Sequence, residues 1–317
     1  MKKYLFLGID GGGTQTKTAL ISKDSERVAD AVWESINYNS VGEEQVVRVL
    51  EKILTWAYQH LEKDTELLGI GICAAGTSNI NARHIIQKTI DSQHFQGKLL
   101  ITGDQKAALM GALGHMNGVV LIVGTGSICY GMDSSGREAR TGGWGHRIDD
   151  VGSGYDLGRC ILAAIVQAHD GRGPQTVLTD LVFDKYQFSS IEDVIHFVYS
   201  PNTHKQTIAA LSTLLEPAFV QHDPVAIKIA NRAVQNWVQL VTPVVESLHM
   251  QNSTLSLCGG VASKNTYMQK LFSSQIAAIF PSLQLVPPKA SAAVGAAWLV
   301  QYEYTSTRPE SSGNFLL

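Results

Sequence analysis

Residues 4–22 read YLFLGIDGGGTQTKTALIS, and this stretch predicts how the fold begins. The apolar run 4–9 predicts a buried strand, DGGGTQT predicts a tight turn, and 17–22 predicts a returning strand. Residues 28–34 predict a third strand. Connections this short require antiparallel pairing, because a parallel crossover needs about a dozen residues or more. The chain is therefore expected to open with a three-stranded meander.

The rest of the first third alternates between helices and buried strands. Apolar residues at helical spacing predict a helix over 43–61. Strands are expected at 67–74 and 98–102, and helices at 81–90 and 105–113. This alternation is typical of an α/β domain.

The same order of elements starts again near residue 119. Strands at 119–123 and 128–132 flank the turn GTGS, and a third strand is expected at 137–141. This weak internal repeat predicts two related domains, 1–115 and 116–317, with the last helix able to pack back on the first domain. The second domain is expected to contain inserted helices at about 152–169, 175–185, 191–199, 205–221 and 225–250. It should end with strands at 255–258 and 283–286, a turn at GGVAS, and helices at 264–279 and 290–302.

The composition excludes several classes of protein. The chain has 317 residues, 44% hydrophobic and 17% charged, which is typical of globular proteins. The chain has 25 Lys and Arg against 28 Asp and Glu, a net charge of -3, so it lacks the positive charge that favours nucleic acids and we expect no nucleic-acid partner. Four widely spaced cysteines favour neither a zinc site nor a disulfide scaffold. No apolar stretch approaches the roughly 18 residues of a membrane span, and Asp10 interrupts the first apolar run too early for a secretory leader. A soluble cytoplasmic protein is expected.

Three glycine-rich turns are candidates for binding a nucleotide. Asp10 to Thr14, with Lys17, follows the first buried strand, and Gly124 to Ser127 occupies the same place in the repeat. Glycines let backbone N–H groups close around a phosphate. Neither turn matches a Walker A loop or a dinucleotide-binding fingerprint. The third turn, at 258–263, suits either an adenosine or a plain strand-to-helix connection.

The order DGGGT, GTGS and GGVAS resembles the actin-like ATPase and sugar-kinase superfamily. The stretch GGWGH at 142–146, followed by Asp150, resembles more narrowly the N-acetylglucosamine kinases of the BadF/BadG/BcrA/BcrD ATPase family. The resemblance covers nearly the whole chain in motif order. It implies an α/β fold of two ribonuclease-H-like domains around a central cleft, with a helical insertion in the second.

The resemblance also implies a set of residues that bind ATP and Mg²⁺. Asp10 would hold Mg²⁺ through water. The first phosphate loop would be lined by Gly11, Gly12, Gly13, Thr14 and Lys17, the second by Thr125, Gly126 and Ser127, and the adenosine would lie by Gly259 and Gly260.

Asp104 is the catalytic base that the resemblance implies, and its alternative role is a helix N-cap. The sugar would be contacted by Asn37, Ala75, Gly76, Asp104, Gly143, Trp144, Gly145 and Asp150. Trp144 could instead be an anchor beneath its loop. Two positions depart from the family pattern, because Ala75 replaces a serine and Val151 follows Asp150 where an acidic residue is common.

The implied function is transfer of the ATP γ-phosphate to the 6-hydroxyl of N-acetylglucosamine, by a protein expected to form a homodimer. Glucosamine and N-acetylmuramate remain open as substrates. Another class in the same wide family is the ATP-driven electron-transfer activator of a CoA dehydratase or reductase. It needs accessible cysteines for an iron–sulfur cluster, whereas Cys129 and Cys160 lie in apolar surroundings. A non-catalytic sugar sensor is also less favoured, since both glycine loops and Asp104 are intact.

Overall fold

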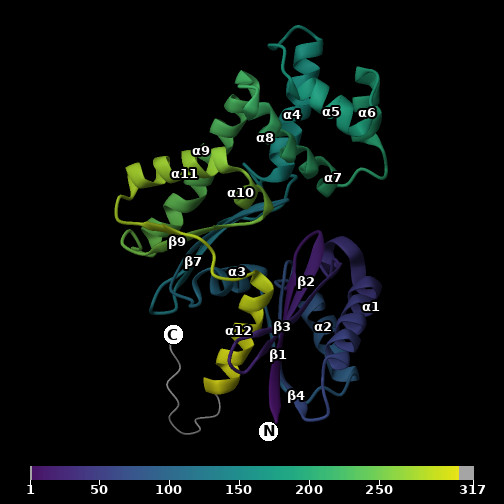
Figure 1. Ribbon diagram of the computed structural model, residues 1–317, viewed down its shortest axis with the longest axis vertical. Helices are drawn as coiled ribbons and strands as arrows, with labels where there is room; N and C mark the ends of the chain where they lie inside the picture. The colour runs from purple at the N-terminus through teal and green to yellow at the C-terminus, as the bar shows by residue number, and fades with distance from the viewer. Residues whose placement is uncertain (1, 307–317) are drawn as a thin grey trace. The chain divides into compact units, whose positions relative to one another are not determined.

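The computed structural model describes residues 2–306, which form two compact units (Figure 1). Unit 1 comprises 2–118 and 287–306, and unit 2 comprises 119–286. The expected division placed the boundary after residue 115 and assigned 116–317 to the second domain, with the last helix able to pack back on the first. The described chain instead crosses after Gly118 and returns at Pro287, so the last helix belongs to unit 1.

Unit 1 contains a mixed sheet in the order β3-β2-β1-β4-β5. Its strands are β1 (Lys3–Gly11), β2 (Gln15–Ser22), β3 (Arg27–Glu34), β4 (Thr65–Ala74) and β5 (Lys98–Thr102). The first three pair antiparallel, which confirms the predicted meander. β4 runs parallel to β1, and β5 runs parallel to β4.

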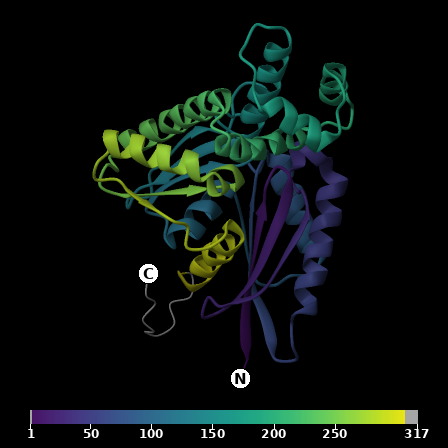
Figure 2. The same cartoon turned by 45° about the horizontal axis from the view of Figure 1, so that its top comes forward.

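Helices cover both faces of the unit 1 sheet. They are α1 (Tyr38–Gln59), α2 (Ile80–Ser92), α3 (Asp104–Leu113) and α12 (Ala292–Ser306). Because side chains alternate along a strand, Leu5, Leu7 and Ile9 of β1 share a core with α1 and α2. Phe6 points the other way and packs with residues of α12. Figures 1 and 2 show α1 and α12 on opposite sides of this sheet.

Unit 2 repeats the sheet of unit 1. Its strands are β6 (Gly118–Val123), β7 (Ser127–Met132), β8 (Glu138–Gly142), β9 (Thr254–Cys258) and β10 (Gln284–Val286), in the order β10-β9-β6-β7-β8. Reading β6 to β10 as counterparts of β1 to β5 gives the same spatial order in both units. β9 is parallel to β6 and β10, and β7 is antiparallel to β8. The predicted internal repeat is therefore confirmed.

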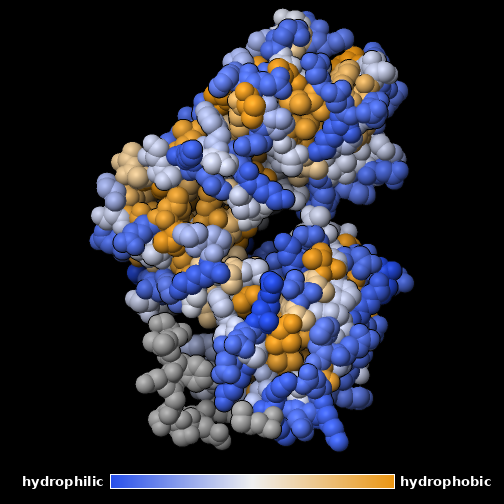
Figure 3. Space-filling view, viewed as in Figure 1, coloured by the Kyte–Doolittle hydropathy of each residue, from blue (hydrophilic) through white to orange (hydrophobic). Residues whose placement is uncertain are grey.

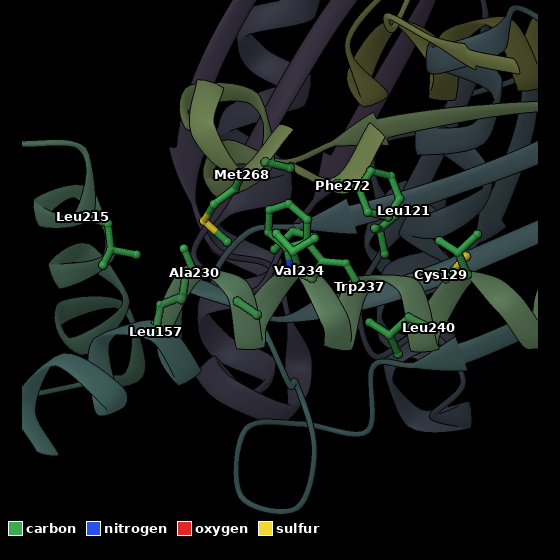
Figure 4. Packing of buried hydrophobic residues seen from close by; sticks show 14 of the residues in the cluster. Leu121, Cys129, Leu157, Leu215, Ala230, Val234, Trp237, Leu240, Met268 and Phe272 are labelled. Carbon is green, nitrogen blue, oxygen red and sulfur yellow. The ribbon is translucent and has the colours of Figure 1, made fainter. Parts of the chain in front are cut away.

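The helices of unit 2 surround one large core. They are α4 (Gly154–His169), α5 (Leu178–Tyr186), α6 (Ile191–Tyr199), α7 (Lys205–Ala209), a 3₁₀ turn (Ala210–Leu214), α8 (Leu215–Val220), α9 (Pro224–Ser247), α10 (Gly260–Lys264) and α11 (Thr266–Ile279). Trp237 of α9 is fully buried and meets Phe272 of α11 edge to face, with ring centroids 6.0 Å apart (Figure 4). These two aromatic rings lie in the core cluster that also contains Leu121 of β6.

Two expected elements of unit 2 were wrong. The single helix expected at 205–221 is broken into α7, the 3₁₀ turn and α8. Pro217 explains the restart, because proline is tolerated in the first turn of a helix but breaks a helix interior. The stretch GGVAS, expected to be a turn, lies largely in α10.

The visible face of each unit is mostly hydrophilic, with smaller apolar patches between the polar side chains (Figure 3). Such scattered exposure of apolar residues is normal for a folded chain. Within residues 2–306, none of the helices combines the length and apolar character needed to cross a membrane.

Candidate active site

The candidate residues of unit 1 meet at the carboxyl edge of its parallel strands. Asp10 near the end of β1 lies opposite Cys73 of β4, which in turn lies opposite Thr102 of β5. The loop beginning at Ala75 and the helix beginning at Asp104 therefore start beside each other. In open α/β sheets, ligands bind outside this edge.

Hydrogen bonds to backbone carbonyls join the loops at this edge. The Ala75 N–H donates to the Gly11 carbonyl at 2.8 Å, and the Thr77 hydroxyl donates to the Thr102 carbonyl at 3.0 Å. The predicted phosphate turn, the loop after β4 and the end of β5 thus form one connected surface. Gly12, Gly13 and Thr14 make the turn between β1 and β2, as predicted from the sequence.

Three charged groups dominate the electrostatics of this edge. Burial, together with repulsion from Asp104, raises the pKa of Asp10 to about 7. Lys17, which pairs with Asp10 across the β1–β2 ladder, offsets part of this rise. Asp10 still reaches solvent in part, but it lies among protein atoms that desolvate its charge. A site of this kind gains stability from a bound cation.

Asp104 is not the N-cap of its helix. Gly103 occupies that position, without a side-chain cap, and Asp104 is the first residue of α3. Its carboxylate is half-buried and close enough to Asp10 to raise the pKa of that group. The alternative role proposed for Asp104 from the sequence is therefore wrong. The helix N-terminus still favours its ionised form, because the helix dipole is positive there.

Asn37 belongs to a cluster of amides that the sequence analysis did not find. Asn37 is the N-cap of α1 and accepts a hydrogen bond from the Asn39 N–H at 3.2 Å. Asn79, the N-cap of α2, donates from Nδ2 to the Asn39 Oδ1 at 3.2 Å. A Cβ on Gly76, whose φ is +86°, would lie 3.0 Å from both Asn37 Oδ1 and Asn39 Nδ2. The only sequence signal was the recurrence of asparagine before two helices, which is also the signal of ordinary capping.

In unit 2 the second glycine turn lies against the loop that contains Asp150. Thr125 and Gly126 connect β6 to β7, and Ser127 begins β7. The Asp150 carboxylate faces the Ser127 N–H at 3.4 Å and is only 7% exposed. Burial raises the pKa of Asp150, while its hydrogen bond with the Ser127 N–H acts in the opposite direction. Lys205, which carried no motif signal, adds a positive charge that acts on Asp150.

The loop from Gly143 to Gly145 presents its tryptophan to solvent. Trp144 is 67% exposed, and the Arg140 guanidinium lies over its ring, 4.2 Å from the centroid. The idea that Trp144 anchors the loop from beneath is therefore wrong. An exposed aromatic face beside a polar loop suits contact with a ligand.

Gly259 lies directly against the strand that leads into the second glycine turn. It has a φ of +94°, and a Cβ at this position would overlap the backbone of Val123. Gly260 then begins α10. The candidate adenosine and phosphate motifs of unit 2 are thus neighbours, because only glycine permits this close approach.

The comparisons with known proteins give one consistent result. A family model described as the BadF/BadG/BcrA/BcrD ATPase family matches residues 7–300. The N-acetylmuramic acid/N-acetylglucosamine kinase of Clostridium acetobutylicum is 34% identical, with 95% of this chain and 99% of the relative covered. The N-acetyl-D-glucosamine kinase of Dictyostelium discoideum is 29% identical, with 94% and 98% covered.

A solved structure agrees with the fold. The crystal structure of a Chromobacterium violaceum protein, named as a candidate N-acetylglucosamine kinase, has a TM-score of 0.75 at 23% identity. The match covers 95% of this chain and 99% of that chain. This likeness and the two repeated five-stranded sheets confirm the predicted fold class.

Proposed function

Since the chain belongs to the BadF/BadG/BcrA/BcrD ATPase family, we propose that it transfers the γ-phosphate of ATP to the 6-hydroxyl of N-acetylglucosamine. The named activities of the Clostridium and Dictyostelium relatives support an amino-sugar substrate. The observation that carries the proposal is the location of Asp104. Its half-buried carboxylate lies at the carboxyl edge of unit 1, beside a glycine-rich turn.

Asp104 is the proposed base of the reaction. Its carboxylate accepts the proton of the sugar 6-hydroxyl as that oxygen attacks the γ-phosphorus. The bond between the γ-phosphorus and the bridging oxygen of the β-phosphate breaks, and ADP leaves. The backbone N–H groups of the glycine turn after β1 hold the phosphate in line for this displacement. A positioned carboxylate base contributes about 10²- to 10⁴-fold to the rate.

The residues of unit 1 fit a magnesium ion that is held mainly by phosphate and water. Asp10 supplies a partly exposed carboxylate whose ionised form is desolvated by the surrounding protein and is destabilised without a counter-charge. Within residues 2–306, no three His, Cys, Asp or Glu side chains are grouped to enclose a metal. Mg²⁺ commonly binds through one or two carboxylates, substrate phosphates and waters. When bound, it neutralises charge on the β- and γ-phosphate oxygens.

The amide of Asn37 favours an N-acylated sugar over a free amine. Its Oδ1 already accepts the Asn39 N–H, so the two N–H groups of Nδ2 are the main groups that Asn37 offers to a ligand. Donors suit a hydroxyl or acyl carbonyl oxygen and repel the ammonium of glucosamine. The carboxylate of N-acetylmuramate is also an acceptor, so that sugar remains the alternative substrate.

The cysteines do not support the electron-transfer alternative. Cys73 and Cys129 are completely buried, and burial raises the pKa of all four thiols. Cluster ligands bind as thiolates, which these surroundings disfavour. We therefore retain phosphoryl transfer as the proposed chemistry.

A coupled assay of ADP release tests the proposal. N-acetylglucosamine, N-acetylmuramate, glucosamine and glucose are compared at equal concentration. The fastest release of ADP is expected with N-acetylglucosamine. Little release is expected without sugar, because a kinase must exclude water from the γ-phosphate to avoid hydrolysing ATP. A high rate that does not depend on sugar would count against a kinase.

The variant Asp104→Asn tests the proposed base. It should lose about 10²- to 10⁴-fold in turnover while still binding sugar, since the amide keeps the shape but cannot accept the proton. Asp24→Asn is the matched control, because Asp24 lies exposed in the β2–β3 turn. Wild-type turnover in the Asp104 variant would contradict the assignment.

A further inference from the structure

The second glycine turn is hydrogen-bonded at several points to the loop that follows β8 and to the first turn of α4. The Ser127 hydroxyl donates to the Val151 carbonyl at 2.8 Å. The Gly154 N–H donates to the Gly124 carbonyl at 2.8 Å, and the Tyr155 N–H donates to the Thr125 carbonyl at 3.2 Å. The proposed phosphate loop and the proposed sugar loop therefore share a network of hydrogen bonds within unit 2.

The Ser127 hydroxyl has a single proton, and the Val151 carbonyl already accepts it. Ser127 is only 3% exposed, so little solvent reaches it. The hydroxyl is consequently committed to the neighbouring loop and is not free to donate to a phosphate. This differs from the role expected from the sequence, in which Ser127 lined the nucleotide directly.

The loop side of this contact is fixed by the core. Asp150 adopts a φ of +60°, which is unusual for a residue with a side chain, and its carboxylate lies against the turn. The indole of Trp237 donates to the Gly152 carbonyl at 2.8 Å. Trp237 lies in the middle of the unit 2 core (Figure 4), so the loop has little freedom to shift alone.

On the side of the glycine turn, Gly126 packs closely against the Asp150 carboxylate. A Cβ on Gly126 would lie 3.0 Å from an oxygen of the Asp150 carboxylate. Any displacement of Asp150 by a bound ligand is therefore transmitted to Gly126 and Ser127, because packed groups cannot deform independently.

We propose that Ser127 is a positioning residue that couples sugar binding at the Asp150 loop to nucleotide binding at the second glycine turn. The inference rests on the proposed function. Binding of either substrate then strengthens binding of the other, and the coupling is reciprocal. The loss of one such hydrogen bond corresponds to roughly a 2- to 12-fold loss of coupling.

The experiment measures binding of N-acetylglucosamine by calorimetry, with and without a non-hydrolysable ATP analogue. Ser127→Ala should lower the ratio of the two affinities roughly 2- to 12-fold, because the loss of one hydrogen bond weakens the coupling by that amount. Its affinity for the analogue in the absence of sugar should stay within about 2-fold of the wild type, because the hydroxyl does not contact phosphate. If Ser127→Ala bound the analogue more weakly than the wild type by the same factor with and without sugar, the inference would be overturned, since this would indicate that the hydroxyl contacts phosphate directly.

Ser153→Ala is the matched control. The Ser153 hydroxyl is buried in the same segment and caps α4 by accepting the Asp156 N–H at 3.2 Å. It does not join the two loops, so this variant should lose stability but keep the coupling ratio. If Ser127→Ala does not fold, Gly126→Ala crowds the Asp150 carboxylate, which is the neighbouring contact between the same two loops, and should also lower the ratio.

The outcomes separate the inference from the function on which it rests. If wild-type protein does not bind N-acetylglucosamine, the proposed function fails and the inference falls with it. If the sugar binds and is phosphorylated but the wild-type ratio is one, only the inference is overturned. A ratio lost equally in Ser127→Ala and Ser153→Ala would also overturn it.

Discussion

Replacing Gly76 by alanine should impair the sugar site in a way that its backbone conformation alone does not explain. The φ of +86° lowers the free energy of unfolding of the alanine variant by about 1–2 kcal/mol. The stiffer unfolded chain offsets about 0.4–1 kcal/mol of this loss. The new Cβ would also lie 3.0 Å from Asn37 Oδ1 and Asn39 Nδ2. Both amides must move by a few tenths of an ångström to relieve this contact. We expect a modest loss of stability and a clear loss of sugar affinity.

The loss of affinity can be sized from one misaligned hydrogen bond. At about 0.5–1.5 kcal/mol, it corresponds to a roughly 2- to 12-fold rise in KM for N-acetylglucosamine. KM for ATP should change less, because Asn37 is a proposed sugar contact. The assay is coupled ADP release over a range of sugar concentrations, at saturating ATP.

Gly136→Ala is the control for the backbone term. Gly136 has a φ of +83° in the turn between β7 and β8, and no atom lies within 4 Å of an added Cβ. Gly136→Ala should lose a similar free energy of unfolding through its backbone conformation, without changing KM for the sugar. Equal sugar KM values in the two variants would refute the reasoning from crowding at Asn37.

Three further changes test the carboxylates and the packing of the fold. Asp10→Asn should raise the Mg²⁺ concentration for half-maximal rate about 10- to 100-fold, as for other residues that position a metal, and an unchanged magnesium titration would contradict that role. Gly8→Ala places a Cβ into the backbone of α12 and should destabilise unit 1 by about 1–3 kcal/mol, measured by urea denaturation. The Ser135 hydroxyl and the Arg137 side chain hold the pKa of Asp133 below its usual range. The ionised Asp133 therefore stabilises the fold at any pH above its unfolded-state pKa of about 3.9. This stabilisation disappears as the pH falls through the lower folded-state pKa. Asp133→Ala should therefore have a lower free energy of unfolding than the wild type at neutral pH, and this difference should shrink in acid. A difference that grows in acid would contradict the lowered pKa.

Much of the candidate site could be predicted because its signals are local. A buried strand followed by DGGGT, and a strand end followed by Asp104, are patterns within a few residues. They specify a turn or a helix start whatever surrounds them. The repeat in the order of elements could also be inferred, since a strand, a glycine-rich turn and two further strands recur along the chain.

The rest of the site depends on contacts between distant segments. Asn39 and Asn79 are separated by 40 positions, and only the packing of α1 beside α2 brings their amides together. Lys205 acts on Asp150 across a helical insertion. The commitment of the Ser127 hydroxyl to Val151 likewise joins residues that no motif connects.

The sequence by itself indicated most of the strands, the glycine turns and the family, because strands follow from periodicity and the family from a resemblance in short motifs. It did not determine where the last helix packs. The stretch AAVGAAW in α12 is apolar around the whole helix, so no amphipathic face selects a partner. Tertiary structure decided this point, because Gly8 and Gly71 leave space on the unit 1 sheet for the backbone of α12. Complementarity of this kind is a property of two surfaces together, and neither segment specifies it alone.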